Sequence, residues 1–262
     1  MVELFFWPAL LGYGEAALAY AGNARRPGIA GRLATWGVRL GWLAQTALLA
    51  VQAARADGFP WDTWAGSLNL FVWLVVGVYL IWGCRARYRL LGLVVMPLAA
   101  ALLVLARVGG GTGTAARSDY STVFLVVHVG LVIAAFAGFT VSAAVFALYL
   151  WQERRLKRRR AGSLLGRAPS LLALETIAAR TIAFSLPALT VGIAAGFVRL
   201  ESKGGRLDAL MVVTLLTWAV YAAFLVLRYE AGWRGRRAAY LALAGFALVL
   251  VARLGLPLTH FA

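Results

Sequence analysis

Apolar residues gather in eight runs along the chain, and polar residues mark the connections between them. At 1.5 Å per residue, a helix of about 20 residues crosses the roughly 30 Å of hydrocarbon in a bilayer. The pattern predicts an all-α polytopic membrane protein, one transmembrane domain over residues 1–262 with eight transmembrane helices. The expected spans are residues 4–22, 33–54, 64–83, 90–108, 120–151, 179–198, 209–227 and 238–257.

Composition agrees with this reading and excludes several other classes of protein. Of the 262 residues, 62% are hydrophobic and 14% are charged, whereas soluble domains are about 45–50% apolar and about 25% charged. A disordered chain, a collagen-like fibre and a disulfide scaffold are excluded. The single cysteine, Cys84, excludes an internal disulfide and a Cys-x-x-Cys motif. The start of the sequence lacks a basic segment, so we expect the first run to be a retained span.

The distribution of basic residues along the chain is typical of a membrane protein rather than of a nucleic-acid-binding protein. The net charge is +16, and most of the 26 Lys and Arg residues lie in or beside alternate connections. The positive-inside rule places those connections in the cytoplasm and both termini outside. We therefore expect contact with anionic lipid head groups and no nucleic-acid partner. The basic connections are residues 25–32, 85–89, 154–167 and 228–237.

The longest of these connections, residues 152–178, is a basic cytoplasmic loop. Leucines at 164, 165, 171, 172 and 174 alternate with charged residues within it. This pattern is typical of a short amphipathic helix on the inner membrane surface. A solvated connector explains it equally well.

Ionisable residues inside spans are costly, so each one is a candidate for a special role. Glu15 and Arg39 lie at similar depths in the first two spans, and we expect them to form an ion pair. The alternative is that each snorkels or faces a wet crevice alone. Arg253 lies near the outer end of the last span, where it could snorkel or hold an anionic ligand.

The only two histidines share one height. His128 is 23 residues from Trp151, and His260 is 23 residues from Arg237, both measured from the cytoplasmic boundary. Each imidazole is then roughly 34 Å above that boundary, at the outer interface. Two such imidazoles could clamp a haem plane, and the absence of nearby Cys, Asp or Glu ligands argues against zinc. The alternative is that both are interfacial polar anchors.

Several stretches resemble the CcsA/CcmC-type cytochrome c assembly family, whose members handle haem. The resemblance covers residues 58–262, and the order and spacing of the pieces carry it. The pieces are 64–73 (WAGSLNLFVW), the helix from His128 to 152–157 (QERRLK), 217–222 (TWAVYA), 232–240 (GWRGRRAAY) with 245–250 (GFALVL), and 258–262 (LTHFA).

This resemblance implies that His128 and His260 are the axial ligands of a haem b on the outer face. Basic residues on that side would pair with its propionates; a solvated or lipid-facing charge is the alternative for each. The family's tryptophan-rich loop is missing, since residues 199–208 contain no tryptophan. This departure from the family's pattern favours the HemX-like branch of the family. The candidate propionate partners are Arg117, Arg199, Arg206 and Arg253, with Lys203 beside them.

The sequence supports three functions in descending order. The first is a haem-handling protein of the cytoplasmic (inner) membrane that presents haem for cytochrome c biogenesis, with apocytochrome c and a CcsB/ResB-type membrane partner implied by the resemblance. The second is a membrane regulator of haem biosynthesis that acts through its cytoplasmic loop. The third is a small-molecule permease. The resemblance implies at most a part in a haem-attachment system. The sequence has no P-loop and no nucleophile elbow, so a kinase or a hydrolase is not supported.

Overall fold

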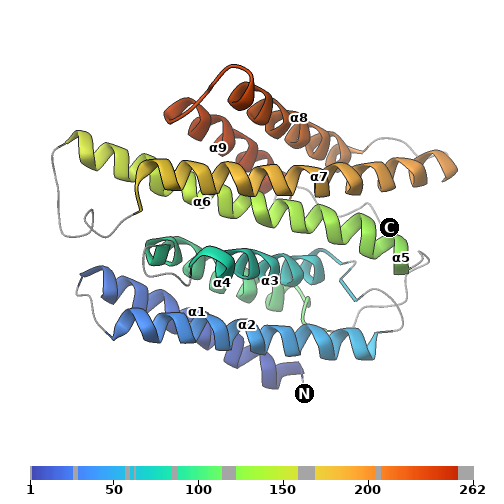
Figure 1. Cartoon of the computed structure of the whole chain (residues 1–262). Coiled ribbons are helices and arrows are strands. Elements are labelled where there is room, and N and C mark those ends of the chain that lie inside the picture. Colours follow the sequence, from blue (N-terminus) through green and yellow to red (C-terminus); the bar gives the residue numbers. More distant parts are fainter. Residues whose placement is uncertain are drawn as a thin grey trace. The chain divides into compact units, whose positions relative to one another are not determined.

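The computed structural model consists of helices in two compact units (Figure 1). It describes residues 2–25, 29–56, 60–61, 63–83, 88–113, 122–158, 169–203 and 208–252. One unit comprises Met1–Arg117 and Gln152–Ser170. The other comprises Ser118–Trp151 and Leu171–Ala262.

The helices follow the expected spans closely. In the described ranges they are α1 (Val2–Arg25), α2 (Ala30–Arg55), α3 (Trp64–Gly83), α4 (Arg89–Val108), α5 (Thr122–Leu125), η2 (Val126–Gly130), α6 (Leu131–Lys157), α7 (Leu171–Lys203), α8 (Ala209–Tyr229) and α9 (Arg236–Leu250). The short α5 and the π-helical turn η2 lead directly into α6. Residues 122–157 therefore form one continuous helical stretch.

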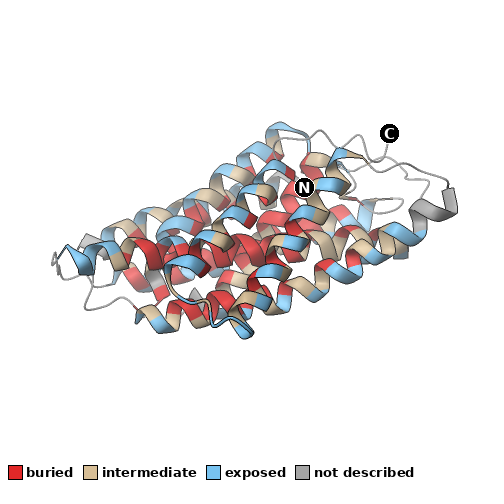
Figure 2. Cartoon of the chain, turned by 90° about the horizontal axis from the view of Figure 1, so that it is seen from above, coloured by how far each residue is buried: buried red, intermediate tan, exposed pale blue. Residues whose placement is uncertain are grey.

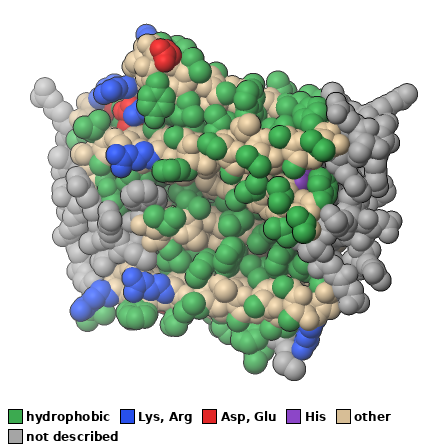
Figure 3. Space-filling model, turned by 45° about the vertical axis from the view of Figure 1, so that its right-hand side comes forward, with side chains coloured by type: hydrophobic (Ala, Val, Ile, Leu, Met, Phe, Trp, Pro, Cys, Tyr) green, Lys and Arg blue, Asp and Glu red, His purple; other side chains and the backbone are tan. Residues whose placement is uncertain are grey.

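The all-helical membrane architecture is confirmed. Within the described ranges, five helical stretches are long and apolar enough to cross a membrane, namely Trp64–Ile81, Leu90–Val108, Val123–Lys157, Leu171–Val198 and Ala209–Tyr229. Many hydrophobic side chains are exposed on the described surface that Figure 3 shows, as is usual for a lipid-facing surface. The total of eight spans and the external termini stay predictions.

In the first unit, α1 and α2 approach so closely that their backbones touch. A Cβ added at Gly12 would lie 2.7 Å from the Gly37 carbonyl oxygen and 2.8 Å from Gly41 Cα. Such small-residue contacts are how helices associate where no hydrophobic effect drives them together. Figure 1 shows the two helices side by side.

Glu15 and Arg39 are not joined in the way that we expected. Both side chains are exposed. The Glu15 carboxylate lies beside Gly37, and the Arg39 guanidinium lies 5.4 Å from the centre of the Trp36 ring. Equal depth along the two helices was therefore not enough to bring the two charges together.

A ladder of buried amide groups connects α1, α2 and α3 to the turn after α4. The Tyr13 hydroxyl donates to Gln45 Oε1 at 2.7 Å, and Gln45 Nε2 donates to Asn69 Oδ1 at 2.9 Å. Asn69 Nδ2 donates to Gln52 Oε1 at 3.1 Å, and Gln52 Nε2 donates to the Gly113 carbonyl at 2.8 Å. All four side chains are fully buried. The ladder satisfies polar groups that would otherwise destabilise an apolar interior.

In the second unit, Tyr221 of α8 holds α6 and α9. Its ring stacks on Phe139 with centroids 3.7 Å apart, and its hydroxyl donates to the Ala242 carbonyl at 3.1 Å. Gly245 makes room for the ring, since a Cβ there would lie 2.8 Å from Tyr221 Cζ. Buried positions form stripes along the helices, and exposed positions form other stripes (Figure 2).

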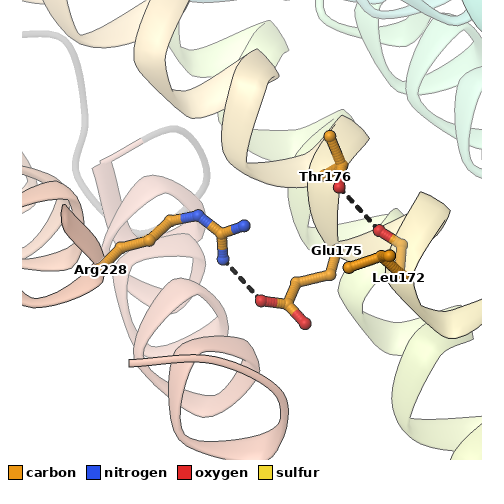
Figure 4. A network of polar contacts seen from close by, with 4 residues as sticks. All are labelled: Leu172, Glu175, Thr176 and Arg228. Atoms are coloured by element: carbon orange, nitrogen blue, oxygen red, sulfur yellow. Dashed lines mark hydrogen bonds and ion pairs between the residues drawn. The ribbon is translucent and has the colours of Figure 1, made fainter. Parts of the chain in front are cut away.

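A buried ion pair fastens α7 to α8. Arg228 Nη1 donates to Glu175 Oε1 at 2.7 Å, and the two side chains are only 13% and 7% exposed (Figure 4). Glu175 lies in the stretch 171–178 that the sequence suggested for a separate surface helix or connector. In the structure that stretch forms the first turns of α7, and Leu174 and Ala178 are fully buried there. Leu164 and Leu165 lie outside the described residues.

We expect Gly12→Val to separate α1 from α2 and to lower the free energy of unfolding by about 1–3 kcal/mol, the usual cost of overpacking. Gly14→Val is the matched control, because a Cβ at Gly14 meets nothing within 4 Å. Unfolding of both variants in detergent, followed by circular dichroism, measures the difference. Equal losses in the two variants would contradict the close contact.

We expect Arg228→Met to lower the free energy of unfolding by about 3–5 kcal/mol, because it leaves the buried Glu175 carboxylate unpaired. The double variant Glu175→Met/Arg228→Met removes both charges and is expected to recover most of that loss. The same detergent unfolding assay compares the variants. A double variant no more stable than Arg228→Met would show that the carboxylate is not the cause.

Candidate functional site

His128 lies in an unusual turn of its helix. It is the central residue of the π-helical turn η2, which precedes α6. Single π-turns are rare inside α-helices and frequently mark functional sites, because they redirect side chains. The His128 side chain is half-buried.

One hydrogen bond orients the His128 ring. Its Nδ1 lies 2.7 Å from the Gly192 carbonyl oxygen in α7. A carbonyl oxygen can only accept, so Nδ1 carries the hydrogen, and in the neutral ring Nε2 carries the lone pair. Metal-binding histidines are held in this way, with one ring nitrogen donating to a backbone carbonyl and the other available to a metal by its lone pair.

Two glycines of α7 leave room for the His128 ring and for the neighbouring Val132. A Cβ at Gly196 would lie 2.6 Å from His128 Cε1 and 3.0 Å from Nδ1, and a Cβ at Gly192 would lie 2.7 Å from Val132 Cγ2. The ring also stacks on Phe124, with centroids 5.4 Å apart and planes 11° apart. The imidazole is therefore held by contacts from α5 and α7 together.

The site lies where the apolar part of α7 ends. The apolar stretch of that helix runs from Leu171 to Val198, and Arg199 follows it. Positions 192, 196, 199 and 203 are spaced by four, three and four residues, so they share one face of α7. The register thus places Arg199, and Lys203 one turn further, in line with the two glycines that contact His128. The side chains of Arg199 and Lys203 lie outside the described residues.

Most of the other predicted site residues are not described. Arg117, Arg206, Arg253 and His260 all lie in ranges that the structure leaves out. The pairing of His128 with His260 therefore stays a prediction. Among the described residues, no group of three or more His, Cys, Asp or Glu side chains could hold a metal ion.

Gly192, Gly196 and Phe124 are the site residues that the sequence reading missed. The spacing Gly-x-x-x-Gly over 192–196 is a known signal for close helix packing. It could have indicated that another helix lies against this point of α7. It could not have indicated that the partner is the helix that carries His128.

The apolar helices and the oriented imidazole at the end of an apolar span define a multi-pass membrane protein with an oriented histidine as its candidate site. Residues 61–260 match the sequence profile of the family described as Cytochrome C assembly protein. The match covers well over half of the chain and includes both histidines. The chain therefore belongs to this family of cytochrome c assembly proteins.

Relatives from two groups resemble the chain over most of its length. It is 25% identical to cytochrome c biogenesis protein CcsA of Gloeobacter violaceus, with 88% of this chain and 85% of that protein covered. The CcsA protein of Microcystis aeruginosa is 28% identical, with 86% and 84% covered. The HemX protein of Brevibacillus brevis is 30% identical, with 84% and 82% covered.

The alignments with the HemX and CcsA proteins differ in how many gap positions they contain. The alignment with HemX is 224 residues long for 84% of this chain, so it contains few gaps. The alignments with the two CcsA proteins are 291 and 277 residues long for 88% and 86% of this chain, so they contain longer ones. No solved structure matches the chain.

The tautomer of His128 can be measured by nuclear magnetic resonance of ¹⁵N-labelled imidazole. In His260→Gln only His128 contributes, because the chain has two histidines. We expect the signals of a neutral ring with the hydrogen on Nδ1. Gly196→Leu should displace the ring from the Gly192 carbonyl and shift the population away from this tautomer, whereas Gly130→Leu, with nothing within 4 Å of its Cβ, should not. A ring with its hydrogen on Nε2 in the parent protein would contradict the hydrogen bond.

Proposed function

We propose that the protein binds haem b at the outer face of the cytoplasmic membrane and presents it for cytochrome c biogenesis. The observation that carries this proposal is the 2.7 Å contact between His128 Nδ1 and the Gly192 carbonyl. This contact orients the ring and leaves its lone pair on Nε2, the arrangement of an axial ligand. Membership of the cytochrome c assembly family supports the same conclusion.

The residues around His128 fit an apolar ring with an anionic edge. Val123 is 75% exposed and Val126 is 51% exposed, so they offer apolar surface within one turn of the imidazole. The register of α7 places Arg199 beyond the glycines, where the span meets the polar interface. An arginine at this level suits a carboxylate because its guanidinium can form two parallel hydrogen bonds.

His260 would supply the second axial ligand. Its distance from Arg237 along the sequence equals that of His128 from Trp151, 23 residues in each case. The continuous helical stretch through η2 and α6 supports the depth assigned to His128. Bound haem would supply the iron porphyrin that cytochromes c carry, and the protein would hold and orient it. Arg117, Arg206 and Arg253 are further proposed partners of the propionates, with Arg199.

The remaining partners follow from the family. A chain made mostly of membrane helices offers little outer surface for a protein substrate. We therefore propose that a membrane protein with a large outer domain, of the CcsB/ResB type, holds the apocytochrome c beside it. The names of the CcsA relatives support a place in cytochrome c biogenesis.

A second candidate function is regulation of haem biosynthesis, as in a HemX-like protein. Two observations favour it: the nearly gap-free alignment with HemX, and the absence of tryptophan from residues 199–208. In that case the basic cytoplasmic loop predicted over residues 152–178 would be the active part, and haem binding would be unnecessary.

The visible absorption spectrum of the purified full-length protein supplied with haem tests the proposal. We expect the sharp spectrum of six-coordinate low-spin haem, in both oxidation states, from the parent protein. His128→Gly and His260→Gly should each lose it, because each removes one axial ligand, and added imidazole should restore it by replacing the missing ring.

Val212→Ala is the control, because it changes an exposed valine of another helix, α8, to which no haem contact is assigned. It should keep the parent spectrum. Binding no stronger than that of an unrelated membrane protein, or unchanged spectra in both histidine variants, would overturn the ligand assignment. Absence of haem binding would favour the regulatory function instead.

A further inference from the structure

The face of α1 and α2 carries two exposed charges in the middle of long apolar stripes. Exposed apolar side chains line both helices, and in lipid they need no partner. Glu15 and Arg39 are different, because a charge inside a bilayer is costly unless it is paired. The apolar stripes include Leu4, Leu11 and Leu18 of α1 and Trp36, Leu40 and Leu43 of α2.

The two charges lie at the same depth. α1 ends at Arg25 and α2 begins at Ala30, so the two helices run in opposite directions from a short connection. Glu15 is ten residues before the end of α1, and Arg39 is nine residues after the start of α2. At 1.5 Å per residue, both lie about 14–15 Å from the connection. That distance is near the middle of a bilayer about 30 Å thick.

Within the described part of the chain, neither charge has an oppositely charged partner. The Glu15 carboxylate lies beside Gly37, and the Arg39 guanidinium lies over the Trp36 ring. The ion pairs of Lys157 with Glu153 and of Arg228 with Glu175 involve other residues. Two charges at this depth without a described partner of opposite sign indicate that protein, rather than lipid alone, covers this face.

We propose that a second copy of this chain covers the face of α1 and α2. In a dimer with its two-fold axis along the membrane normal, residues at equal depth face each other across the interface. Glu15 of one copy then meets Arg39 of the other, and the same contact recurs on the other side of the axis. One face that presents both signs of charge at one depth is complementary to itself.

Charge reversal distinguishes this pairing from every arrangement within one chain. Glu15→Arg alone places like charges at both contacts of the dimer, and so does Arg39→Glu alone. A mixed dimer of one copy of each variant has opposite charges at both contacts. We expect each single variant to be monomeric, with a dissociation constant raised about tenfold or more. The mixture is expected to dimerise like the parent protein.

The measurement is the mass of the full-length protein in lipid nanodiscs or mild detergent by light scattering. Capture of one tagged variant by the other, after both are produced in the same cells, gives a second readout. Arg55→Glu, an exposed reversal at the far end of α2, is the control and should leave the dimer intact. A monomeric parent protein, single variants that remain dimers, or a mixture that stays monomeric would each overturn the proposal.

Discussion

The hydrogen bond from His128 to the Gly192 carbonyl is the contact on which the candidate site depends. It sets the orientation and the tautomer of the imidazole in one step. It forms only because Gly192 and Gly196 lack side chains where the two helices meet. The π-turn at residues 126–130 directs the ring toward that gap. Packing between helices therefore orients a side chain that can bind a metal.

The same constraint recurs elsewhere, because a membrane interior penalises any polar group without a partner. Gln45, Gln52 and Asn69 satisfy one another in a buried ladder. Glu175 and Arg228 form a buried pair that fastens two helices. Glu15 and Arg39 depart from the rule within one chain, which is why they point to a partner. Glycines at 12, 37 and 41 have the same role for α1 and α2 that Gly192 and Gly196 have for His128.

The helices could be predicted from the length of the apolar runs, and most helix boundaries lie near those expected, whereas α7 begins eight residues earlier. Five of the expected membrane spans are apolar and long enough to cross, and the total of eight stays a prediction. Contacts between helices could not be predicted from the sequence. The matched depths of Glu15 and Arg39 suggested an ion pair, but direction around a helix depends on packing that depth does not report. Glu175 was assigned to a surface helix or connector because its neighbours alternate in polarity; in the structure that stretch is part of α7, and Leu174 and Ala178 are buried there. The contact between His128 and Gly192 could not be predicted from the sequence either, since it joins residues 64 positions apart.

The central claim is that His128 and His260 hold one haem iron between them. Pulsed electron paramagnetic resonance of the ferric, haem-loaded protein with ¹⁵N-labelled histidine tests it most directly, because coupling to the iron identifies its ligands. The account predicts a low-spin centre coupled to two ¹⁵N imidazole nitrogens. A high-spin centre, or coupling to a single imidazole, would contradict it.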